Sequence, residues 1–266
     1  MSNQIFGLTH VPLSKNVKTL WDDGQQFAHF SRQFQWLLDS PGIGLFTGDP
    51  GVGKTAALRH VTQGMNPHRY QLIYMPDTNF SRVDLYRHLA FALGLEVSYR
   101  RAQLWKDIKE RIVELYDKKN VLIIWVIDEA HNLPRDFFTD FPSFLNFALD
   151  SRDIITVWFV GHASLAISLD KTIHVALSSR IAVRACLKPI VERERFTALL
   201  DHAFKEAGGQ IKLLSDSGIE ILRQASQGRP RHVSSILNTA MKLGALKGLS
   251  HLPDDLLQAA IEELKQ

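Results

Sequence analysis

Five short apolar segments occur in the first 187 residues of the chain. Each is rich in β-branched or aromatic residues and lacks the polar alternation of a half-exposed strand, which is typical of strands buried on both faces of a sheet. The predicted strands are GIGLFTG (42–48), YQLIYMP (70–76), VLIIWVI (121–127), IITVWFVG (154–161) and IAVRACL (181–187). We therefore expect a sheet with little polar surface on either face.

Amphipathic segments lie before and between these strands and predict helices. FSRQFQWLL (30–38) has apolar residues at helical spacing, and SRVDLYRHLAFALG (81–94) begins with Ser81 and Asp84, spaced as in a capping box. A third segment, 102–117, carries one apolar stripe made of Leu104, Ile108, Ile112 and Leu115. Strands that alternate with helices predict a parallel α/β sheet flanked by helices.

The pattern changes after Pro189, where strands are no longer predicted. Four segments there have helical periodicity: 192–207, 216–227, 231–247 and 253–265. We interpret them as a small all-helical lid domain. The predicted domains are a lead-in with FGLTHVP (1–28), an α/β domain (29–189) and the helical lid domain (190–266).

Composition narrows the classes of protein that remain. The chain has 266 residues, of which 45% are hydrophobic, and its net charge of +3 does not by itself indicate a nucleic-acid-binding protein. The single cysteine, Cys186, excludes an internal disulfide and a multi-cysteine zinc site. MSNQIFGLTH does not resemble a signal peptide, and no apolar run approaches the ~18 residues of a membrane span. We therefore expect a cytoplasmic protein without membrane contact.

The segment GDPGVGKT (48–55) follows a predicted strand and precedes a predicted helix, as a phosphate-binding loop requires. Its glycines allow the backbone amides to turn inward around phosphate oxygens. Lys54 is expected to reach the β- and γ-phosphates, and the Thr55 hydroxyl to bind Mg²⁺. The predicted ATP contacts are Gly48, Asp49, Pro50, Gly51, Val52, Gly53, Lys54, Thr55 and Ala56.

The strand VLIIWVI is followed by two carboxylates, Asp128 and Glu129. A carboxylate at the carboxyl end of a buried parallel strand faces the ligand crevice. Asp128 is the second candidate Mg²⁺ ligand, and Glu129 is the candidate to orient or deprotonate the attacking water.

These motifs together resemble those of the AAA+ ATPases. FVGH ends the fourth predicted strand, and the resemblance makes His162 the sensor-1 residue. SSRIAVR resembles the arginine-finger segment, with Arg180 the best match and Arg184 the next, and GRPRH resembles the sensor-2 motif with Arg231. The resemblance assigns catalytic roles to His162, Arg180 and Arg231, together with Lys54 and Glu129. It also implies a homo-oligomer, because an arginine finger completes the site of a neighbouring subunit.

The order of the motifs is similar to that in the ExeA-like branch of AAA+ ATPases. From FGLTHVP through IDEAHNLP to GRPRHV, the resemblance covers nearly the whole chain. That branch includes a larger, membrane-anchored secretion ATPase and compact transposition regulators of the TnsC, TniB and IstB kinds. Because no membrane segment or additional domain is visible, we expect the second kind.

One segment is a candidate for DNA binding. SYRRAQLWKDIKER (98–111) is rich in basic residues, which phosphates attract. The candidate contacts are Tyr99, Arg100, Arg101 and Lys106. The alternative is a solvated helix face with charge pairs such as Lys106 with Glu110, and the sequence favours neither.

The resulting hypothesis is an ATP-dependent regulator that oligomerises on double-stranded target DNA, as a ring or a helical filament, and recruits or activates a transposase. A target-selector protein is a further candidate partner. Three alternatives remain: a secretion-type mechanical ATPase, a nucleotide-gated scaffold with little hydrolysis, and a helicase loader.

Overall fold

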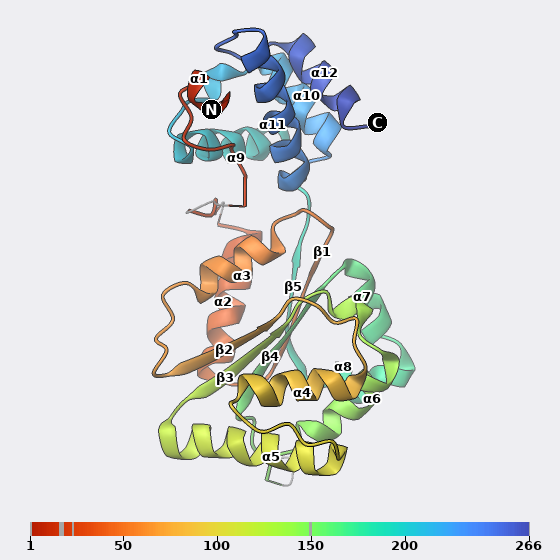
Figure 1. Ribbon diagram of the computed structural model, residues 1–266. Coiled ribbons are helices and arrows are strands. Elements are labelled where there is room, and N and C mark those ends of the chain that lie inside the picture. The colour runs from red at the N-terminus through yellow and green to blue at the C-terminus, as the bar shows by residue number, and fades with distance from the viewer. Residues whose placement is uncertain (1, 16–18, 23, 149–150, 266) are drawn as a thin grey trace. The chain divides into compact units, whose positions relative to one another are not determined.

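The computed structural model of the chain describes residues 2–15, 19–22, 24–148 and 151–265. The fold separates into two compact units (Figure 1). The first, which we call the helical unit, comprises Met1–Gln25, Asp49–His60 and Lys188–Gln266. The second, the sheet unit, comprises Gln26–Gly48 and Val61–Leu187.

The sheet unit contains one five-stranded parallel sheet. Its strands are β1 (Ile43–Gly48), β2 (Tyr70–Met75), β3 (Leu122–Ile127), β4 (Ile155–Gly161) and β5 (Ile181–Leu187). They are ordered β2-β3-β4-β1-β5, and every neighbouring pair is parallel. The five predicted strands and the parallel α/β class are confirmed.

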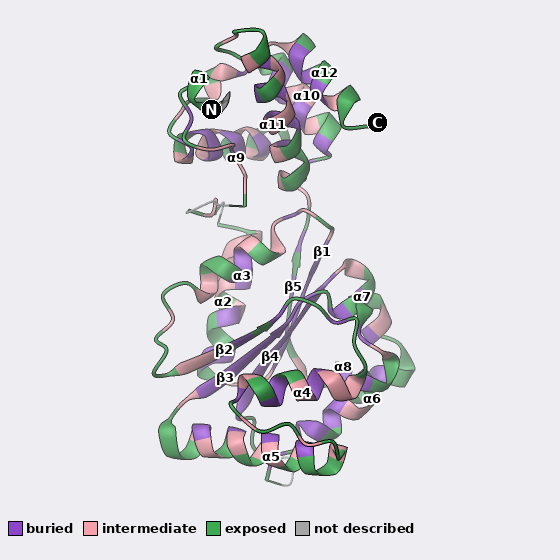
Figure 2. Cartoon of the chain, in the orientation of Figure 1, coloured by how far each residue is buried: buried purple, intermediate pink, exposed green. Residues whose placement is uncertain are grey.

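Burial differs between the central and the edge strands (Figure 2). Every residue of β1, β3 and β4 is buried, as predicted, whereas the edge strands β2 and β5 alternate between buried and more exposed residues. The prediction of burial on both faces was therefore wrong for the edge strands. Outer strands have one neighbour and incomplete cover, so their apolar runs do not imply full burial.

An aromatic layer joins α2 (Gln26–Asp39) to one face of the sheet. Phe30 stacks on Phe46 with 3.8 Å between ring centroids, and Phe34 stacks on Trp158 at 5.5 Å. Gly44 makes room for this layer, because a Cβ at that position would lie 2.5 Å from the Trp158 ring. Two stacked pairs of this kind orient α2 immediately before the strand that leads to the glycine loop.

Three longer helices cover the opposite face: α4 (Arg82–Ala92), α5 (Arg101–Val113) and α6 (Arg135–Phe144). The predicted cap of α4 is confirmed, since the Ser81 side chain accepts a hydrogen bond from the Asp84 amide. The predicted stripe of α5 is buried from Leu104 to Leu115, the last residue lying in a π-helical turn, Glu114–Lys118. Two shorter helices, α7 (Ala163–Leu169) and α8 (Val175–Ser178), follow β4.

The helical unit contains α9 (Arg193–Glu206), α10 (Asp216–Ser226), α11 (Pro230–Leu246) and α12 (Asp254–Glu263). The predicted helical C-terminal region is confirmed. None of the helices in the described part of the chain combines the length and apolar character that crossing a membrane requires.

The N-terminal segment packs into the core of the helical unit, a contact that sequence analysis did not anticipate. After α1 (Ser2–Ile5), Phe6 and Leu8 are 4% and 2% exposed among residues of α9 to α12. The Thr9 amide donates to the Ala207 carbonyl at 2.8 Å, and a Cβ at Gly209 would lie 2.3 Å from the Leu8 side chain. The FGLTHVP segment is thus part of this core, and the domain boundaries at 28 and 189 stay predictions.

Candidate nucleotide-binding site

The glycine loop connects the end of β1 at Gly48 to the start of α3 (Lys54–Thr62). Gly51 and Gly53 have φ values of +81° and +108°, which are unfavourable for residues with a Cβ. No atom lies within 4 Å of the position that a Cβ would occupy at Gly53. The loop therefore has a backbone that glycine alone adopts easily, and open space beside it.

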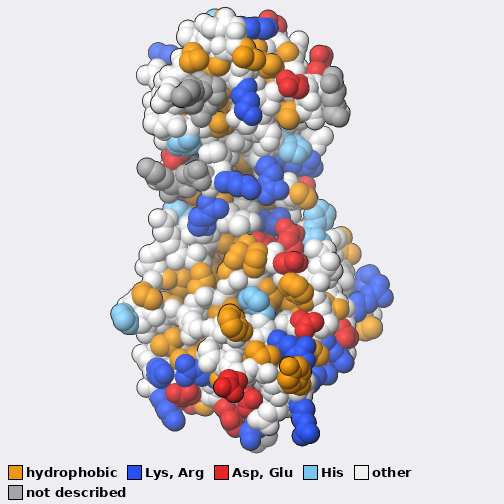
Figure 3. Space-filling model, viewed as in Figure 1, with side chains coloured by type: hydrophobic (Ala, Val, Ile, Leu, Met, Phe, Trp, Pro, Cys, Tyr) orange, Lys and Arg blue, Asp and Glu red, His pale blue; other side chains and the backbone are white. Residues whose placement is uncertain are grey.

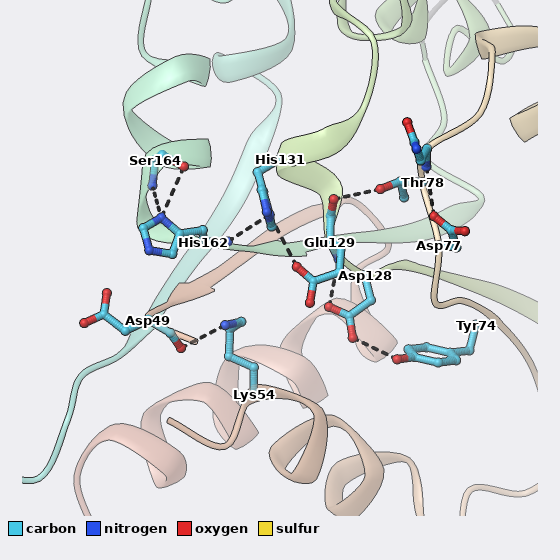
Figure 4. Close-up of polar contacts among 11 residues, drawn as sticks. Asp49, Lys54, Tyr74, Asp77, Thr78, Asp128, Glu129, His131, His162 and Ser164 are labelled. Atoms are coloured by element: carbon cyan, nitrogen blue, oxygen red, sulfur yellow. Dashed lines mark hydrogen bonds and ion pairs between the residues drawn. The ribbon is translucent and has the colours of Figure 1, made fainter. Parts of the chain in front are cut away.

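Lys54 begins α3 and folds back over the loop. Its ammonium group donates a hydrogen bond to the carbonyl of Asp49 at 3.1 Å (Figure 4). Thr55 follows in the first turn and is exposed, whereas Val52 is buried. The cation and the hydroxyl predicted for ATP and Mg²⁺ thus lie in the first turn of one helix, whose N-terminal amides favour anions.

The helical unit holds the glycine loop from a distant part of the sequence. The backbone amide of Arg231, at the start of α11, donates to the Gly51 carbonyl at 3.1 Å. A Cβ on Gly51 would lie 3.0 Å from the Cβ of Arg231. Arg229 adds a side-chain contact, with 3.7 Å between its guanidinium and the Asp49 carboxylate. The predicted sensor-2 segment therefore contacts the predicted phosphate loop, mainly through the backbone.

The carboxylate of Asp128 lies just beyond β3 and is held on both oxygens. Asp128 is 4% exposed; one of its oxygens accepts the Glu129 amide at 2.9 Å, and the other accepts the Tyr74 hydroxyl at 2.8 Å (Figure 4). Tyr74 is not predicted as a site residue by any sequence pattern. It lies on β2, which pairs with β3, and its contact could have been predicted only once that strand order was known.

Glu129 has an unusual backbone conformation for a non-glycine residue, with φ of +51°. Its carbonyl accepts a 2.7 Å hydrogen bond from the hydroxyl of Thr78, which is fully buried, while its own side chain is 53% exposed. A left-handed conformation costs about 1–2 kcal/mol for a residue with a Cβ. The surrounding structure imposes it at the position where sequence analysis expects the catalytic carboxylate.

Two histidines extend this group. His131 places its Nδ1 atom 3.5 Å from the Glu129 carboxylate, and the same Nδ1 accepts the backbone amide of His162 at 3.3 Å (Figure 4). His162 uses its ring to cap α7, accepting from the Ser164 amide at 3.3 Å. The structure thus gives His162 a capping contact, and its sensor role stays a prediction. The sequence places His131 in the IDEAH motif but predicts no role for it.

Each of the two regions, taken by itself, has residues of the kind that bind ATP and Mg²⁺. The open space beside Gly53 is compatible with a phosphate group. The ammonium of Lys54 supplies the charge, and the Thr55 hydroxyl and the Asp128 carboxylate are hard oxygen donors of the kind that Mg²⁺ prefers.

The two candidate arginine fingers lie on either side of the start of β5. Arg180 lies in the turn between α8 and β5, where its amide donates to the Leu177 carbonyl at 3.0 Å. Arg184, on β5, forms an ion pair with Asp170 at 2.9 Å and donates to the Ser178 hydroxyl at 2.9 Å. Arg184 is therefore bound within its own chain.

The candidate DNA segment begins α5. Tyr99 is 92% exposed in the preceding loop. Arg101 binds the Asp140 carboxylate at 2.6 Å and lies over the Trp105 ring at 4.5 Å, while Lys106 pairs with Glu110 at 3.8 Å. The charge pair expected under the alternative interpretation is thus present. Positive and negative side chains are mixed at the α5 end of the sheet unit (Figure 3).

Comparisons with known proteins agree with this geometry. Residues 38–167 match the family model described as AAA domain. A curated relative, general secretion pathway protein A of Aeromonas hydrophila, is 25% identical over 98% of this chain. The chain covers 48% of that relative, so it spans about half of the relative's length.

Solved structures with a similar fold are distant in sequence. Cdc6p of Pyrobaculum aerophilum has a TM-score of 0.70 at 20% identity, covering 98% of this chain and 70% of that one. Drosophila ORC bound to DNA has a TM-score of 0.70 at 16% identity, covering 100% and 65%. The RuvB branch-migration motor of Thermotoga maritima has a TM-score of 0.56 at 18% identity, covering 92% and 70%. The chain therefore has the P-loop fold of AAA+ proteins, with a parallel sheet flanked by helices and a helical C-terminal region.

Proposed function

We propose that this protein is an ATP-hydrolysing AAA+ regulator of DNA transposition, which oligomerises on target DNA and recruits or activates a transposase. One observation carries the ATPase part of the proposal. In an AAA+ fold, a glycine loop leads directly into a helix that starts with Lys54, and the interior strand β3 is followed by Asp128 and Glu129.

Each of these residues has a defined task in ATP hydrolysis. Bound ATP with Mg²⁺ supplies the phosphoanhydride bond to be cleaved. The loop amides and Lys54 would bind the β- and γ-phosphates, and Thr55 and Asp128 are the candidate ligands of the metal ion. Glu129 orients the attacking water and accepts its proton. Tyr74 and the Glu129 amide keep the Asp128 carboxylate in one orientation, as outer hydrogen bonds do around many metal ligands.

Two arginines are assigned roles in the oligomer. Arg180 acts across the interface on the site of a neighbouring subunit, and Arg231 acts on the nucleotide of its own subunit. The contact between the Arg231 amide and Gly51 supports the second assignment.

DNA binding is supported by the exposed loop before α5 and by the fold shared with an ORC structure bound to DNA. Tyr99 and Arg100 are the leading contacts, since Arg101 is anchored by Asp140 and Trp105 and Lys106 pairs with Glu110. A small charge on each subunit is sufficient when an oligomer presents it repeatedly to one duplex.

The transposition part of the proposal rests on the order of motifs from FGLTHVP to GRPRHV, which resembles that of transposition regulators. The 25% identical secretion-pathway relative favours a second candidate function, a mechanical ATPase of secretion. DNA binding separates the two candidates, because only the first requires it.

The deciding experiment is a fluorescence anisotropy titration of duplex DNA with ATP, ADP or no nucleotide. We expect cooperative, largely sequence-independent binding that requires ATP and falls steeply as salt rises. If the protein does not bind DNA in any nucleotide state at low salt, the transposition function is wrong and the secretion function replaces it. If it binds, adding the purified transposase of the same element should give strand transfer that depends on ATP and on this protein.

A further inference from the structure

The Nδ1 atom of His131 lies between two groups that belong to different parts of the sheet unit. It accepts the backbone amide of His162, at the end of β4, at 3.3 Å, and it lies 3.5 Å from the carboxylate of Glu129, beyond β3 (Figure 4). The ring of His131 therefore lies next to both the end of β4 and the proposed catalytic carboxylate.

One ring nitrogen cannot serve both groups at once. To accept the His162 amide, Nδ1 must carry a lone pair, and to donate to Glu129 it must carry a proton. The two interactions therefore exclude each other. Any movement of the β4 end that withdraws the His162 amide leaves the Nδ1 lone pair free to take up a proton, after which Nδ1 can donate to Glu129.

The glycine at the end of β4 leaves room for the His131 ring. Gly161 ends β4, and a Cβ there would lie 3.2 Å from the His131 Nδ1 and 3.3 Å from its backbone nitrogen. The rings of His131 and His162 meet edge to face, with centroids 6.2 Å apart. The glycine at the end of the strand thus allows the imidazole to lie against the backbone.

A contact from His131 would restrain the Glu129 side chain, which is less constrained than the Glu129 backbone. Thr78 fixes the Glu129 carbonyl at 2.7 Å, whereas the Glu129 side chain is 53% exposed. A carboxylate that samples many rotamers is less often oriented toward the attacking water, so limiting its motion raises the rate of the chemical step.

We propose that His131 is a positioning residue that couples the end of β4 to Glu129 and holds the carboxylate in place for hydrolysis. This inference rests on the proposed ATPase function. His131 acts through Glu129 and is not expected to contribute to nucleotide affinity.

Two substitutions with amide side chains test whether the Nδ1 position of His131 is the one that matters. In His131→Asn the amide group lies near the place of Nδ1, and either its oxygen can accept from His162 or its nitrogen can donate to Glu129. In His131→Gln the amide lies one bond further out, near the place of Nε2. We expect His131→Asn to keep kcat within about threefold of the wild type, and His131→Gln and His131→Ala to lower kcat about tenfold, the lower end of the loss seen when an outer hydrogen-bond partner is removed.

KM for ATP and the affinity for a fluorescent ATP analogue should stay unchanged in all three variants, since a positioning residue affects the chemical step. His88→Asn is the matched control, because His88 is an exposed histidine on α4. Equal kcat values for the Asn and Gln variants, or a parallel loss of nucleotide affinity, would overturn the inference. If the wild-type protein binds ATP but does not hydrolyse it, the proposed ATPase function itself is wrong, which is a different result.

Discussion

The glycine loop and the acidic pair are held by different kinds of contact. At the loop, the contact with α11 joins two backbone groups, because the Arg231 amide donates to the Gly51 carbonyl. Around the acidic pair, neighbouring side chains make contacts in addition to backbone bonds such as that from the Asn132 amide to the Glu129 carbonyl. Tyr74, Thr78 and His131 supply a phenol, a hydroxyl and an imidazole.

This difference determines which substitutions each region tolerates. A backbone contact persists when the side chain is replaced, provided that the backbone keeps its conformation. A side-chain contact is lost with its residue. We therefore expect conservative substitutions of the residues around the acidic pair to affect the site. Around the loop, we expect substitutions of the glycines to have the larger effect.

The largest effect is expected at the acidic pair itself. Glu129→Gln removes the proton acceptor and should lower kcat for ATP hydrolysis by about 10²- to 10⁴-fold while ATP still binds. Phosphate release and binding of a fluorescent ATP analogue measure the two steps separately. Hydrolysis at the wild-type rate would show that Glu129 is not the base.

The loop should respond to Lys54→Ala in the opposite way. Loss of the ammonium removes a charged hydrogen bond to phosphate worth about 1.5–3 kcal/mol, so ATP affinity should fall by about 10- to 150-fold. Equilibrium titration with the same analogue measures it. Lys54→Arg, which retains the charge, is the matched variant; if Lys54→Ala binds ATP as tightly as the wild type, the loop does not bind phosphate as proposed.

Sequence patterns predicted the strands, the helices and both motifs, because each depends on a local feature. An unbroken apolar run such as 122–127 indicates a buried strand, and GDPGVGKT indicates a phosphate loop wherever it lies. Tyr74 and Thr78 could not be predicted, since their contacts require the pairing of β2 with β3 and the left-handed backbone at Glu129.

The N-terminal segment shows the same limit. Phe6 and Leu8 have no helical or strand periodicity around them, yet they are buried against helices about 200 residues further along the chain. Tertiary packing determines where such a segment lies, and no local sequence pattern predicts its position.

A smaller effect is expected when one side-chain partner of the acidic pair is removed. Tyr74→Phe deletes the hydroxyl bound to Asp128 and keeps the ring, so Asp128 loses one fixed hydrogen bond. We expect the Mg²⁺ concentration for half-maximal hydrolysis to rise about tenfold, with little change in thermal stability. Tyr70→Phe, on the same strand, is the control. An unchanged Mg²⁺ requirement would mean that Tyr74 does not orient a metal ligand.

The smallest effect is expected at the side-chain contact of the loop, the ion pair of Arg229 with Asp49. Its groups are 3.7 Å apart, and their side chains are 29% and 35% exposed, so solvent screens the attraction and the pair contributes about 0–1 kcal/mol. Asp49→Asn and Arg229→Gln should each change ATP affinity by less than about fivefold. A double-mutant cycle should give a coupling energy below about 1 kcal/mol. The backbone contact between Arg231 and Gly51 is present in all of these variants. If the coupling exceeds 2 kcal/mol, side chains hold the loop as firmly as they hold the acidic pair, and the contrast between the two regions is wrong.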